Sequence, residues 1–482
     1  MKKTILLSLL LFLFLYSSFA GNVVVGTKTY PVDTLAHYKV GPGSYYTSLH
    51  FVDATNPLRV FFLEVDATNP YVSFKSVLGK DSTLTCECPT DMAKRKSKAG
   101  AVYFAGTNAD FFNIKGPIGL PIAGCMVEGQ IGLIPTSRPD IAFDKNLIPF
   151  IGINVFDGTI RFAGKSFPIT AVNTTRSPDQ LVMYNSLNGR YTHTDSNGTE
   201  VLVRLMDTDW GVNKTLKAKI VKVETGVGNM PVPAGSAVLS GQGIAQSFLK
   251  ALKVNDEIEL NLGITMTNGG EKPSLTDMVG GDRLILQDGQ VAGTDWVKPN
   301  PRTAMGFSAD KTRIYFCVVD GRSQLSVGVS TKQLADIMKS AGAYTAINLD
   351  GGGSSCMYVK ELNVVNVTSD GKERPVGNGI FAVSSAPVDT VICEIGPYQH
   401  SRQLSKSDVF RPTFLGYNQY GTILSTNVQG IVLTCDPKLG TITAKGEFVA
   451  SGADNGVLNA TYKDLQTHIA IRINTENAMS RP

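Results

Sequence analysis

The alternation of hydrophobic and polar residues predicts strands over most of this chain and helices at only a few places. From about residue 22 to residue 90 the two kinds of residue alternate, as in HFVDATNPLRVFFLEVDATNP, which is typical of half-buried strands. Residues 140–275 continue this pattern, with turn signals at 156–158 and 196–198. Helical spacing is expected at 90–99, near 245–252 and after Ser330. The pattern therefore indicates an α+β protein with a mixed sheet and strand-rich N-terminal and middle sections.

A strand–helix–strand unit is predicted between residues 312 and 349. Residues 312–320, TRIYFCVVD, form an apolar run typical of a buried strand. Ser330 and Gln333 have the spacing of a capping box, and the apolar residues at 334, 337, 338 and 341 then form one helix face. Gly342 ends the helix, and an apolar strand follows at 344–349. If the two strands are parallel, Asp320 and Asp350 leave the sheet at the same edge.

The second of these strands runs into a corner that is rich in glycine. The sequence YTAINLDGGGSSCMY (344–358) places Asp350 at the strand end and glycines at 351–353, followed by Ser354 and Ser355. Glycine has no Cβ, so backbone N–H groups there can face a ligand directly. A tight turn without a ligand is the alternative, although three consecutive glycines are more than a turn needs. We therefore expect a functional site at Asp350.

An earlier segment repeats part of this arrangement. KSKAGAVYFAGTNAD (96–110) and MKSAGAYTAINLD (338–350) share a helix end, Ala-Gly-Ala, a strand and a final aspartate. Asn108 and Asp110 are therefore expected at an equivalent strand end, where their side chains could bind a polar ligand or a cation. An Asx-turn would use the same residues without any ligand.

Composition and charge narrow the class of protein. The 482 residues are 43% hydrophobic and 18% charged, so the chain is globular and long enough for two or three domains. The formal net charge is only +4, and the basic run at 94–96 is typical of a solvated helix face. We therefore expect no nucleic-acid partner. The sequence does not predict an oligomeric state.

The first residues, MKKTILLSLLLFLFLYSSFA, have the features of a secretory signal. Lys2 and Lys3 precede an apolar core at 5–16, and Ser18-Phe19-Ala20 offers small residues for cleavage. The apolar run is short for a membrane span, and no later segment is long and apolar enough to form one. We expect an exported protein, periplasmic or extracellular, whose mature chain begins near Gly21 and does not span a membrane.

Cysteine and histidine are too scattered to indicate a disulfide framework or a metal site. The seven cysteines are odd in number and few for this length, and the sequence does not predict their pairing. Cys86 and Cys88 lack the second pair or nearby histidine that a zinc site needs. No cofactor is required by the sequence and no metal ligands are assigned, although Asp110, Asp320 and Asp350 could together hold a calcium or magnesium ion.

Several short motifs give the chain a resemblance to a known family. In order they are Gly280-Gly281, NPRTAMGF (300–307), VVDGR (318–322), NLDGGGSS (348–355) and RPVGNGI (374–380). Together they resemble the phosphodiester glycosidase family over most of residues 40–388. The chain departs from that family at Asp282-Arg283, where proline is common, and at Cys356, where a small hydroxyl residue is usual. The tail resembles bacterial group 2 immunoglobulin-like domains through GTITAKGEFVA (440–450).

The resemblance and a shift in composition near Val388 divide the chain into parts. Residues 1–20 are the signal, 21–90 a strand-rich section of the catalytic unit, 91–388 the phosphodiester glycosidase domain, and 389–482 an immunoglobulin-like β-sandwich. The sandwich is expected to serve adhesion or spacing and to be separable from catalysis.

The resemblance implies a hydrolase that cleaves the C1–O bond of a sugar-1-phosphodiester, such as an N-acetylglucosamine-1-phosphodiester, in envelope or extracellular glycans. Asp350 is expected to be the carboxylate beside C1, and Asp320 its partner acid/base or orienter, with a helix or turn cap as the alternative for Asp320. Arg302 is expected to hold phosphate oxygens in a bidentate fork, with a structural salt bridge as the alternative.

Further contacts with the carbohydrate phosphodiester are expected from backbone N–H groups, hydroxyls and amides. Arg374 is a second candidate for the phosphate, although a surface ion pair explains it nearly as well. The serines are weak candidates for a nucleophile, because no G-x-S-x-G elbow accompanies them. The expected substrate-binding residues are Asn108, Asp110, Gly351, Gly352, Gly353, Ser354, Ser355, Arg374 and Asn378.

Two other functions stay open at this point. The same fold could belong to a non-catalytic protein that binds cell-envelope polysaccharides. It could also belong to a phosphodiesterase that cuts the P–O bond, although such enzymes usually show a dense His/Asp metal cluster, which this sequence lacks.

Overall fold

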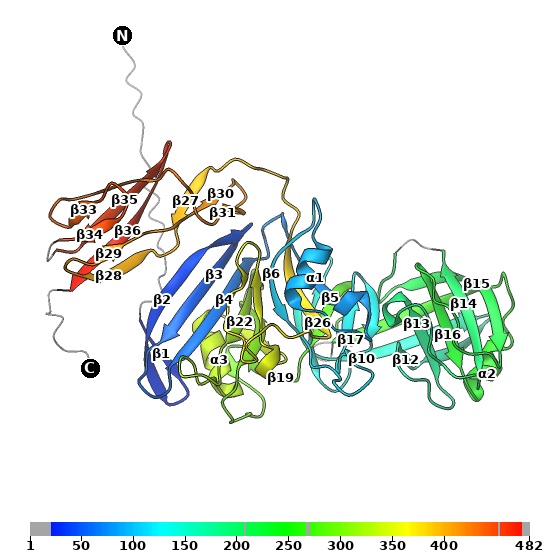
Figure 1. Ribbon diagram of the computed structural model, residues 1–482. Coiled ribbons are helices and arrows are strands. Elements are labelled where there is room, and N and C mark those ends of the chain that lie inside the picture. Colours follow the sequence, from blue (N-terminus) through cyan, green and yellow to red (C-terminus); the bar gives the residue numbers. More distant parts are fainter. Residues whose placement is uncertain (1–20, 207–208, 267–269, 452–453, 475–482) are drawn as a thin grey trace, which may run out of the picture.

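The computed structural model describes residues 21–206, 209–266, 270–451 and 454–474, so the predicted signal at 1–20 lies outside the described residues. Strands dominate the described part of the chain, and its α-helices are short (Figure 1): α1 (Pro89–Lys96), α2 (Ile244–Leu249) and α3 (Thr331–Ser340). This confirms the α+β, strand-rich fold class. Among these residues no helix has the length and apolar character needed to cross a membrane.

A nine-stranded sheet carries the predicted strand–helix–strand unit. Its strands, in order, are β1 (Gly21–Val25), β2 (Lys28–Gly41), β3 (Ser44–Phe51), β4 (Leu58–Asp66), β22 (Arg313–Val319), β21 (Arg302–Phe307), β23 (Thr345–Asn348), β19 (Arg283–Gln287) and β20 (Gln290–Val291). β21 is antiparallel to both β22 and β23, so Asp320 and Asp350 leave the sheet at the same edge. The predicted capping box of α3 is present: Gln333 N donates to Ser330 Oγ (3.2 Å), and Ser330 N donates to Gln333 Oε1 (2.9 Å).

A five-stranded sheet packs against the first one and encloses the main core. Phe104 and Ile380 from this sheet share a buried cluster with Phe316 and Ile347 from the nine-stranded sheet. Because the two sheets face each other, a strand end from the five-stranded sheet lies next to a strand end from the nine-stranded sheet near Asp350. The strands, in order, are β25 (Asn363–Val364), β24 (Met357–Val359), β6 (Val102–Asn108), β26 (Asn378–Ser384) and β5 (Val72–Leu78).

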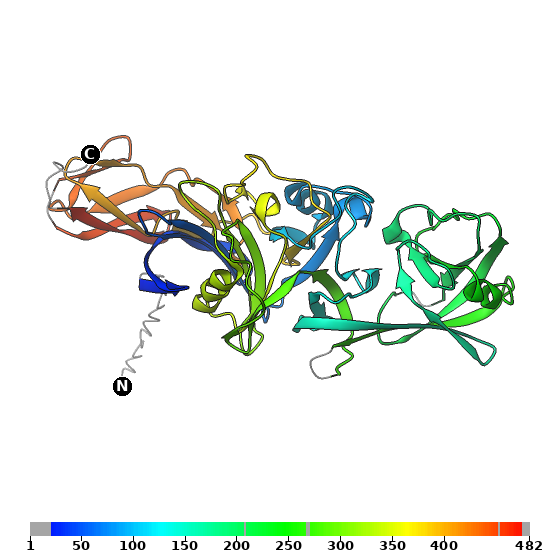
Figure 2. The same cartoon turned by 90° about the horizontal axis from the view of Figure 1, so that it is seen from below.

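The middle of the chain forms a strand-rich lobe, which lies at the opposite end of the molecule from the C-terminal region (Figure 1, Figure 2). The long strand β10 (Pro149–Phe162) links this lobe to the rest, because its start pairs with β9 and its end with β17. The other strands of this sheet, in order, are β12 (Ala171–Val172), β13 (Leu181–Asn185), β16 (Ser236–Gly241), β14 (Thr199–Leu205), β15 (Thr215–Thr225), β17 (Glu257–Met266), then beyond β10, β9 (Pro139–Asp144), β18 (Leu275–Gly280), β7 (Cys125–Val127) and β8 (Gln130–Leu133), with β11 (Lys165–Ile169) paired to β10.

The C-terminal region consists of small sheets, which is consistent with the expected immunoglobulin-like sandwich. It has a core of its own around Phe448 and Leu458, but Leu415 and Tyr417 pack in the main core together with Tyr38. This shared core argues against a freely separable region, because its removal would expose apolar surface. The strands are β27 (Glu394–Pro397), β30 (Phe414–Tyr417) and β31 (Ile423–Ser425); β28 (Ser401–Ser405), β36 (Leu465–Asn474), β35 (Gly456–Tyr462) and β32 (Val432–Cys435); and β29 (Val409–Phe410), β34 (Phe448–Ala450) and β33 (Gly440–Ile442).

Candidate active site

Asn108, at the end of β6, fixes the backbone of Asp350. Asp350 N donates to Ala109 O (2.8 Å), and Asn108 Nδ2 donates to Asp350 O (2.7 Å). The buried Asn108 Oδ1 accepts from Thr303 Oγ1 (3.0 Å) and Cys356 N (3.1 Å). Its amide is thus largely used inside the protein, so Asn108 positions Asp350 rather than offering its full amide to a ligand. The ends of β6 and β23 therefore meet in the structure, whereas the sequence predicted only that the two strand ends are equivalent.

The Asp350 carboxyl lies in a mostly buried position beside the glycine turn. Burial raises the pKa of Asp350 to about 6, and the Ser354 hydroxyl, the nearby Arg374 and the Gly351 N–H oppose this increase. A pKa in this range keeps the carboxylate available near neutral pH while leaving it more basic than an exposed aspartate. Ser354 therefore faces Asp350, whereas Ser355 Oγ accepts from Thr303 Oγ1 (3.2 Å) on the inner side.

Asp110 is a second buried carboxyl, and it interacts electrostatically with Asp350. Its Oδ2 accepts from Ile122 N (3.0 Å) and Ala123 N (2.7 Å). Burial and, to a smaller extent, the charge of Asp350 raise the pKa of Asp110 to about 7, against the effect of Arg138 and the two N–H groups. Both carboxyls therefore have pKa values raised towards neutrality, so one of them can act as a base while the other remains protonated.

Several buried polar atoms around these carboxyls have no hydrogen-bond partner among the described residues. Asn378 Oδ1 accepts from Asp110 N (2.8 Å), but its Nδ2 has no partner. Asn348 Nδ2 donates to Asp282 Oδ1 (2.6 Å), but its Oδ1 has none. Asp110 Oδ1 and Arg138 Nη1 are also buried without partners. Buried polar groups are nearly always paired, so these unpaired donors and acceptors set the surroundings of the two carboxyls apart from an ordinary protein core.

The glycine turn allows two guanidinium groups to approach the backbone. Gly352 has φ +63°, and a Cβ there would lie 2.9 Å from Arg322 Nη2. A Cβ on Gly353 would overlap Arg374 Nη2 and the Asp370 carboxylate. The predicted row of free N–H groups is reduced, however, because Gly352 N donates to Pro301 O (2.9 Å) and the Gly351 N–H bonds Asp350. Arginine side chains therefore provide most of the positive potential at this turn.

Arg322 and Arg374 differ in how their charge is compensated. Arg374 Nε and Nη2 donate to Asp370 Oδ2 (2.8 and 2.6 Å), which is the predicted ion-pair alternative, and Nη1 reaches Ser354 Oγ (3.4 Å). Arg322 instead donates to the neutral side chains of Asn300 (3.1 Å from Nη2) and Ser369 (3.4 Å from Nη1), with no carboxylate partner among the described residues. The sequence interpretation did not single out Arg322, although it directly follows Asp320-Gly321 in the VVDGR motif.

Arg302 is buried, and its guanidinium is used by the backbone. Nε donates to Val329 O (3.1 Å), and Nη2 donates to Lys298 O (3.1 Å) and Trp296 O (3.4 Å). These bonds commit two of the three nitrogens that a bidentate phosphate fork would draw on. Arg302 thus holds the 296–298 loop beside Gly351, and neither the predicted fork nor the predicted salt bridge describes its contacts.

Asp320 lies at the expected edge but faces another segment. Its Oδ1 accepts from Asn366 Nδ2 (3.0 Å) and its Oδ2 from Val367 N (3.0 Å). Burial raises the pKa of Asp320 to about 6. Asn366 also donates to Ser355 O (3.2 Å), so Asp320 supports the segment after the glycine turn. This geometry favours the orienting role over that of a second acid/base.

Two aromatic rings lie beside the site and were not predicted. Arg138 lies over the Phe111 ring (5.5 Å), which meets Trp296 edge to face (6.1 Å between centroids). Arg283 lies over Trp296 (4.1 Å) and donates to Asp282 Oδ2 (2.7 Å). The Asp282-Arg283 pair, which departs from the family pattern, therefore anchors this wall. No motif in the sequence marks Trp296, and Phe111 stands out only as a neighbour of Asp110.

No metal centre is formed by the residues that the structure describes, since no three carboxylate, imidazole or thiol side chains gather as a bound ion would need. Asp110 and Asp350 are electrostatically coupled, but Asp320 is turned away from them. We therefore assign no ligands to a calcium or magnesium ion. The seven cysteines are all free thiols in the structure.

Asp350 and the buried Asp110, beside arginines at a glycine turn, are chemically suited to hydrolysis of an anionic substrate. Comparisons with known proteins agree with this class. Residues 188–383 match the family model described as phosphodiester glycosidase. This match confirms the resemblance for residues 188–383, and that family suggests a glycosidase-type hydrolase.

Individual relatives are distant. YomE, a SPbeta prophage-derived uncharacterized protein of Bacillus subtilis (strain 168), is 36% identical over 117 residues, which is 24% of this chain and 18% of that protein. A hypothetical protein from Synechocystis has a TM-score of 0.55 at 15% identity and covers 74% of this chain and 64% of that one. A protein from Burkholderia pseudomallei K96243 has a TM-score of 0.52 at 24% identity, with 68% of this chain and 74% of that one covered. These structures show a shared fold.

Proposed function

We propose that this protein hydrolyses the C1–O bond of a sugar-1-phosphodiester, releasing a sugar and leaving the phosphate as a monoester on its other partner. The observation that carries the proposal is the group of buried, unpartnered polar atoms around Asp110 and Asp350, next to an arginine without a carboxylate partner in the described chain. The matching family model supports the reaction type.

The two halves of the substrate would meet different sets of residues. The phosphodiester carries a negative charge and would bind Arg322 and Arg374 at the glycine turn, where guanidinium groups suit phosphate oxygens. The sugar would lie against Asp350, with the buried Asp110, Asn348 and Asn378 behind it. This placement puts C1 between the carboxyls and the arginines.

In the proposed reaction, water attacks C1, the C1–O bond breaks, and its electron pair leaves with the phosphomonoester. Positive charge develops on the sugar, and the Asp350 carboxylate stabilises it or accepts a proton from the water. Asp110, whose pKa is about 7, stays largely protonated at slightly acid pH, so it adds no second negative charge beside Asp350 and the anionic substrate. The leaving phosphate needs little protonation, because a phosphomonoester is a good leaving group and the unpaired charge of Arg322 compensates its negative charge.

We further propose that the protein acts after export, on envelope or extracellular glycans. The predicted signal at 1–20 supports this location. The sugar that is accepted would depend on the aromatic wall formed by Phe111 and Trp296. No motif in the sequence indicates the identity of this sugar.

The test is to incubate residues 21–482 with methyl esters of sugar-1-phosphates in isotopically labelled water and to identify the products by mass. Cleavage of C1–O leaves the phosphate without label, whereas cleavage of P–O places the label in the phosphate and supports the phosphodiesterase alternative. Binding without turnover would support the polysaccharide-binding alternative. The Asp350→Asn variant serves as the control, and it should bind substrate without releasing sugar.

A further inference from the structure

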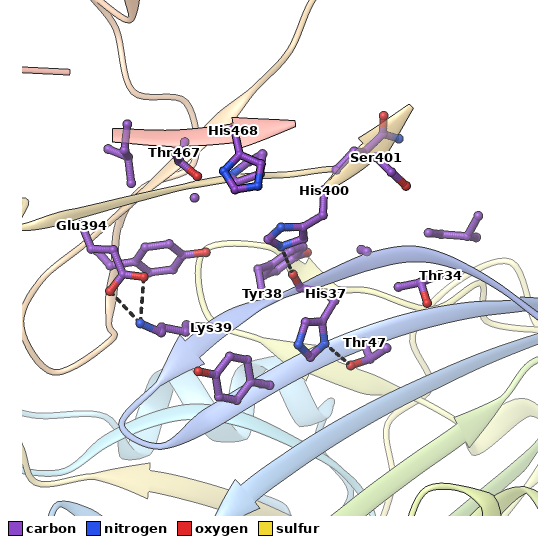
Figure 3. Close-up of a pocket in the computed structure, with 18 residues that line it drawn as sticks. Thr34, His37, Tyr38, Lys39, Thr47, Glu394, His400, Ser401, Thr467 and His468 are labelled. Atoms are coloured by element: carbon purple, nitrogen blue, oxygen red, sulfur yellow. Dashed lines mark hydrogen bonds and ion pairs between the residues drawn. The ribbon is translucent and has the colours of Figure 1, made fainter. Parts of the chain in front are cut away.

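A second pocket lies where the N-terminal strands meet the C-terminal region (Figure 3). We call it the junction pocket; it has a cavity volume of about 260 Å³ and is lined by β2 and β3 on one side and by β27, β36 and the segment before β28 on the other. In the nine-stranded sheet, β2 lies five strand positions from β23, which is roughly 24 Å at ~4.8 Å per step. The junction pocket is therefore separate from the Asp350 site.

The two walls of the junction pocket are held in fixed positions. Lys39 Nζ forms an ion pair with both carboxylate oxygens of Glu394 (2.8 and 2.6 Å). The His400 ring bonds His37 O through Nε2 (2.6 Å). Behind the pocket, Tyr417 packs in the main core with Tyr38. Because these contacts tie the C-terminal region to β2, the pocket exists before any ligand arrives, as ligand pockets between domains usually do.

The lining combines flat rings with hydroxyl groups and little net charge. His37 and Tyr45 are stacked, with 5.3 Å between centroids and 7° between planes. Burial lowers the pKa of His37 and His400, so both are neutral at neutral pH. The one lysine is paired with the one carboxylate of the lining. Hydroxyl groups come from Thr34, Thr47, Ser401 and Thr467, and Thr34 Oγ1 is buried without a partner among the described residues.

We propose that the junction pocket binds one neutral sugar unit of a glycan. A sugar ring presents a C–H face, which packs on flat rings. Its hydroxyl groups need both hydrogen-bond donors and acceptors. The lining of the junction pocket offers both features. An anion finds no uncompensated cation there, in contrast to the turn at Arg322. This proposal rests on the proposed function in one respect, namely that the bound sugar belongs to the same polymer as the phosphodiester. Binding one sugar unit in the junction pocket would then raise the local concentration of phosphodiester at Asp350.

Histidine proton resonances provide a direct test. The chain has five histidines; His37, His400 and His468 line the pocket, whereas His50 and His193 do not. Asp350→Asn protein is titrated with the methyl glycosides of glucose, mannose and N-acetylglucosamine, and separately with inorganic phosphate. We expect a glycoside to shift the three pocket signals, assigned by single His→Gln variants, and to leave His50 and His193 unchanged.

Blocking variants make the test specific. His468 is exposed on β36 at the rim, so His468→Trp should fill the pocket and abolish the shifts of His37 and His400. Gln466→Trp, exposed on the same strand outside this pocket, should leave them intact. Unchanged His50 and His193 signals report that both variants are folded. No shift with any glycoside, or a shift with phosphate alone, overturns the proposal, and this outcome is independent of whether phosphodiesters are hydrolysed.

Discussion

The Asp350 site and the junction pocket lie at different places on the same nine-stranded sheet, and they treat charge in opposite ways. At Asp350, two carboxyls are buried near each other, and the guanidinium of Arg322 has only neutral partners in the described chain. At the junction, Lys39 and Glu394 form an ion pair, and burial keeps two histidines neutral. Buried or charged groups without an oppositely charged partner lower stability but are useful for chemistry. Charged groups that are paired suit the binding of a neutral ligand. The following predictions test this contrast, from the largest expected effect to the smallest.

Removing the charge of Asp350 should abolish catalysis. We expect Asp350→Asn to lower kcat by about 10²–10⁴-fold, the usual contribution of a catalytic acid or base. The melting temperature should not fall, because burial already penalises the carboxylate. Asp288→Asn, in a turn with φ +50°, is the matched control and should retain full activity. Turnover that survives in Asp350→Asn would show that another residue acts at C1.

The two arginines Arg322 and Arg302 should respond differently to the same substitution. Arg322→Met should lower kcat/KM by about 10- to 100-fold, since a charged hydrogen bond contributes roughly 1.5–3 kcal/mol. Its melting temperature should hardly change, because Arg322 bonds only exposed neutral side chains. Arg302→Met should instead unfold at lower temperature, since it leaves backbone carbonyls without a donor. The opposite pattern would show that Arg302, rather than Arg322, binds the phosphate.

The dependence of kcat/KM on pH should be bell-shaped. The reaction needs Asp350 ionised and Asp110 protonated, so kcat/KM should rise as the pH passes about 6 and fall as it passes about 7. The two limbs belong to the coupled pair rather than to either residue alone. Asp110→Asn should remove the alkaline limb. An alkaline limb that persists in this variant would show that a group other than Asp110 titrates there.

Acid should loosen the junction before it affects the core. The pKa values of His37 and His400 are lowered in the folded protein, so the unfolded chain takes up protons first as the pH falls. Their contribution to stability is present above the ordinary histidine pKa of about 6.5 and is lost below it. Protonation would add positive charge beside Lys39 and His468, with Glu394 as the only carboxylate of the lining.

Thermal unfolding measured from about pH 7.5 to about pH 5.5, across the histidine titration range, checks this prediction. His400→Gln should show a smaller decrease than the unmodified protein. His193→Gln, in the middle lobe, should behave as the unmodified protein does. An equal decrease in all three proteins would assign the effect to groups outside the junction.

Much of the fold around Asp350 could be predicted because its signals are local. The capping box at Ser330 and Gln333 and the helical spacing after it gave α3, and the apolar run before Asp350 gave β23. The sequence left the relative direction of β22 and β23 open, and the structure shows that they are parallel. The match of residues 188–383 to the family confirms the resemblance that the motifs indicated. Adjacent residues specify such features through hydrogen bonds within a few positions.

The roles of single side chains could not be predicted in the same way. No feature of the sequence indicates that Arg302 and Arg322 have different roles. In the structure Arg302 donates to backbone carbonyls, whereas Arg322 lies at the glycine turn with neutral partners. The partners of Asp320 lie 46 and 47 positions away, at Asn366 and Val367. Leu415 and Tyr417 join the main core although they belong to the tail that was expected to be separable.

The sequence by itself determined the strand-rich fold class, the helix α3 and the acid that ends β23, because each depends on the preferences of neighbouring residues. Only the tertiary structure decided which arginine keeps an uncompensated charge, which carboxyl couples to Asp350, and where three of the five histidines meet. The pKa of a side chain and its free hydrogen-bonding atoms depend on burial and on distant partners, and these are set when the sheets pack together.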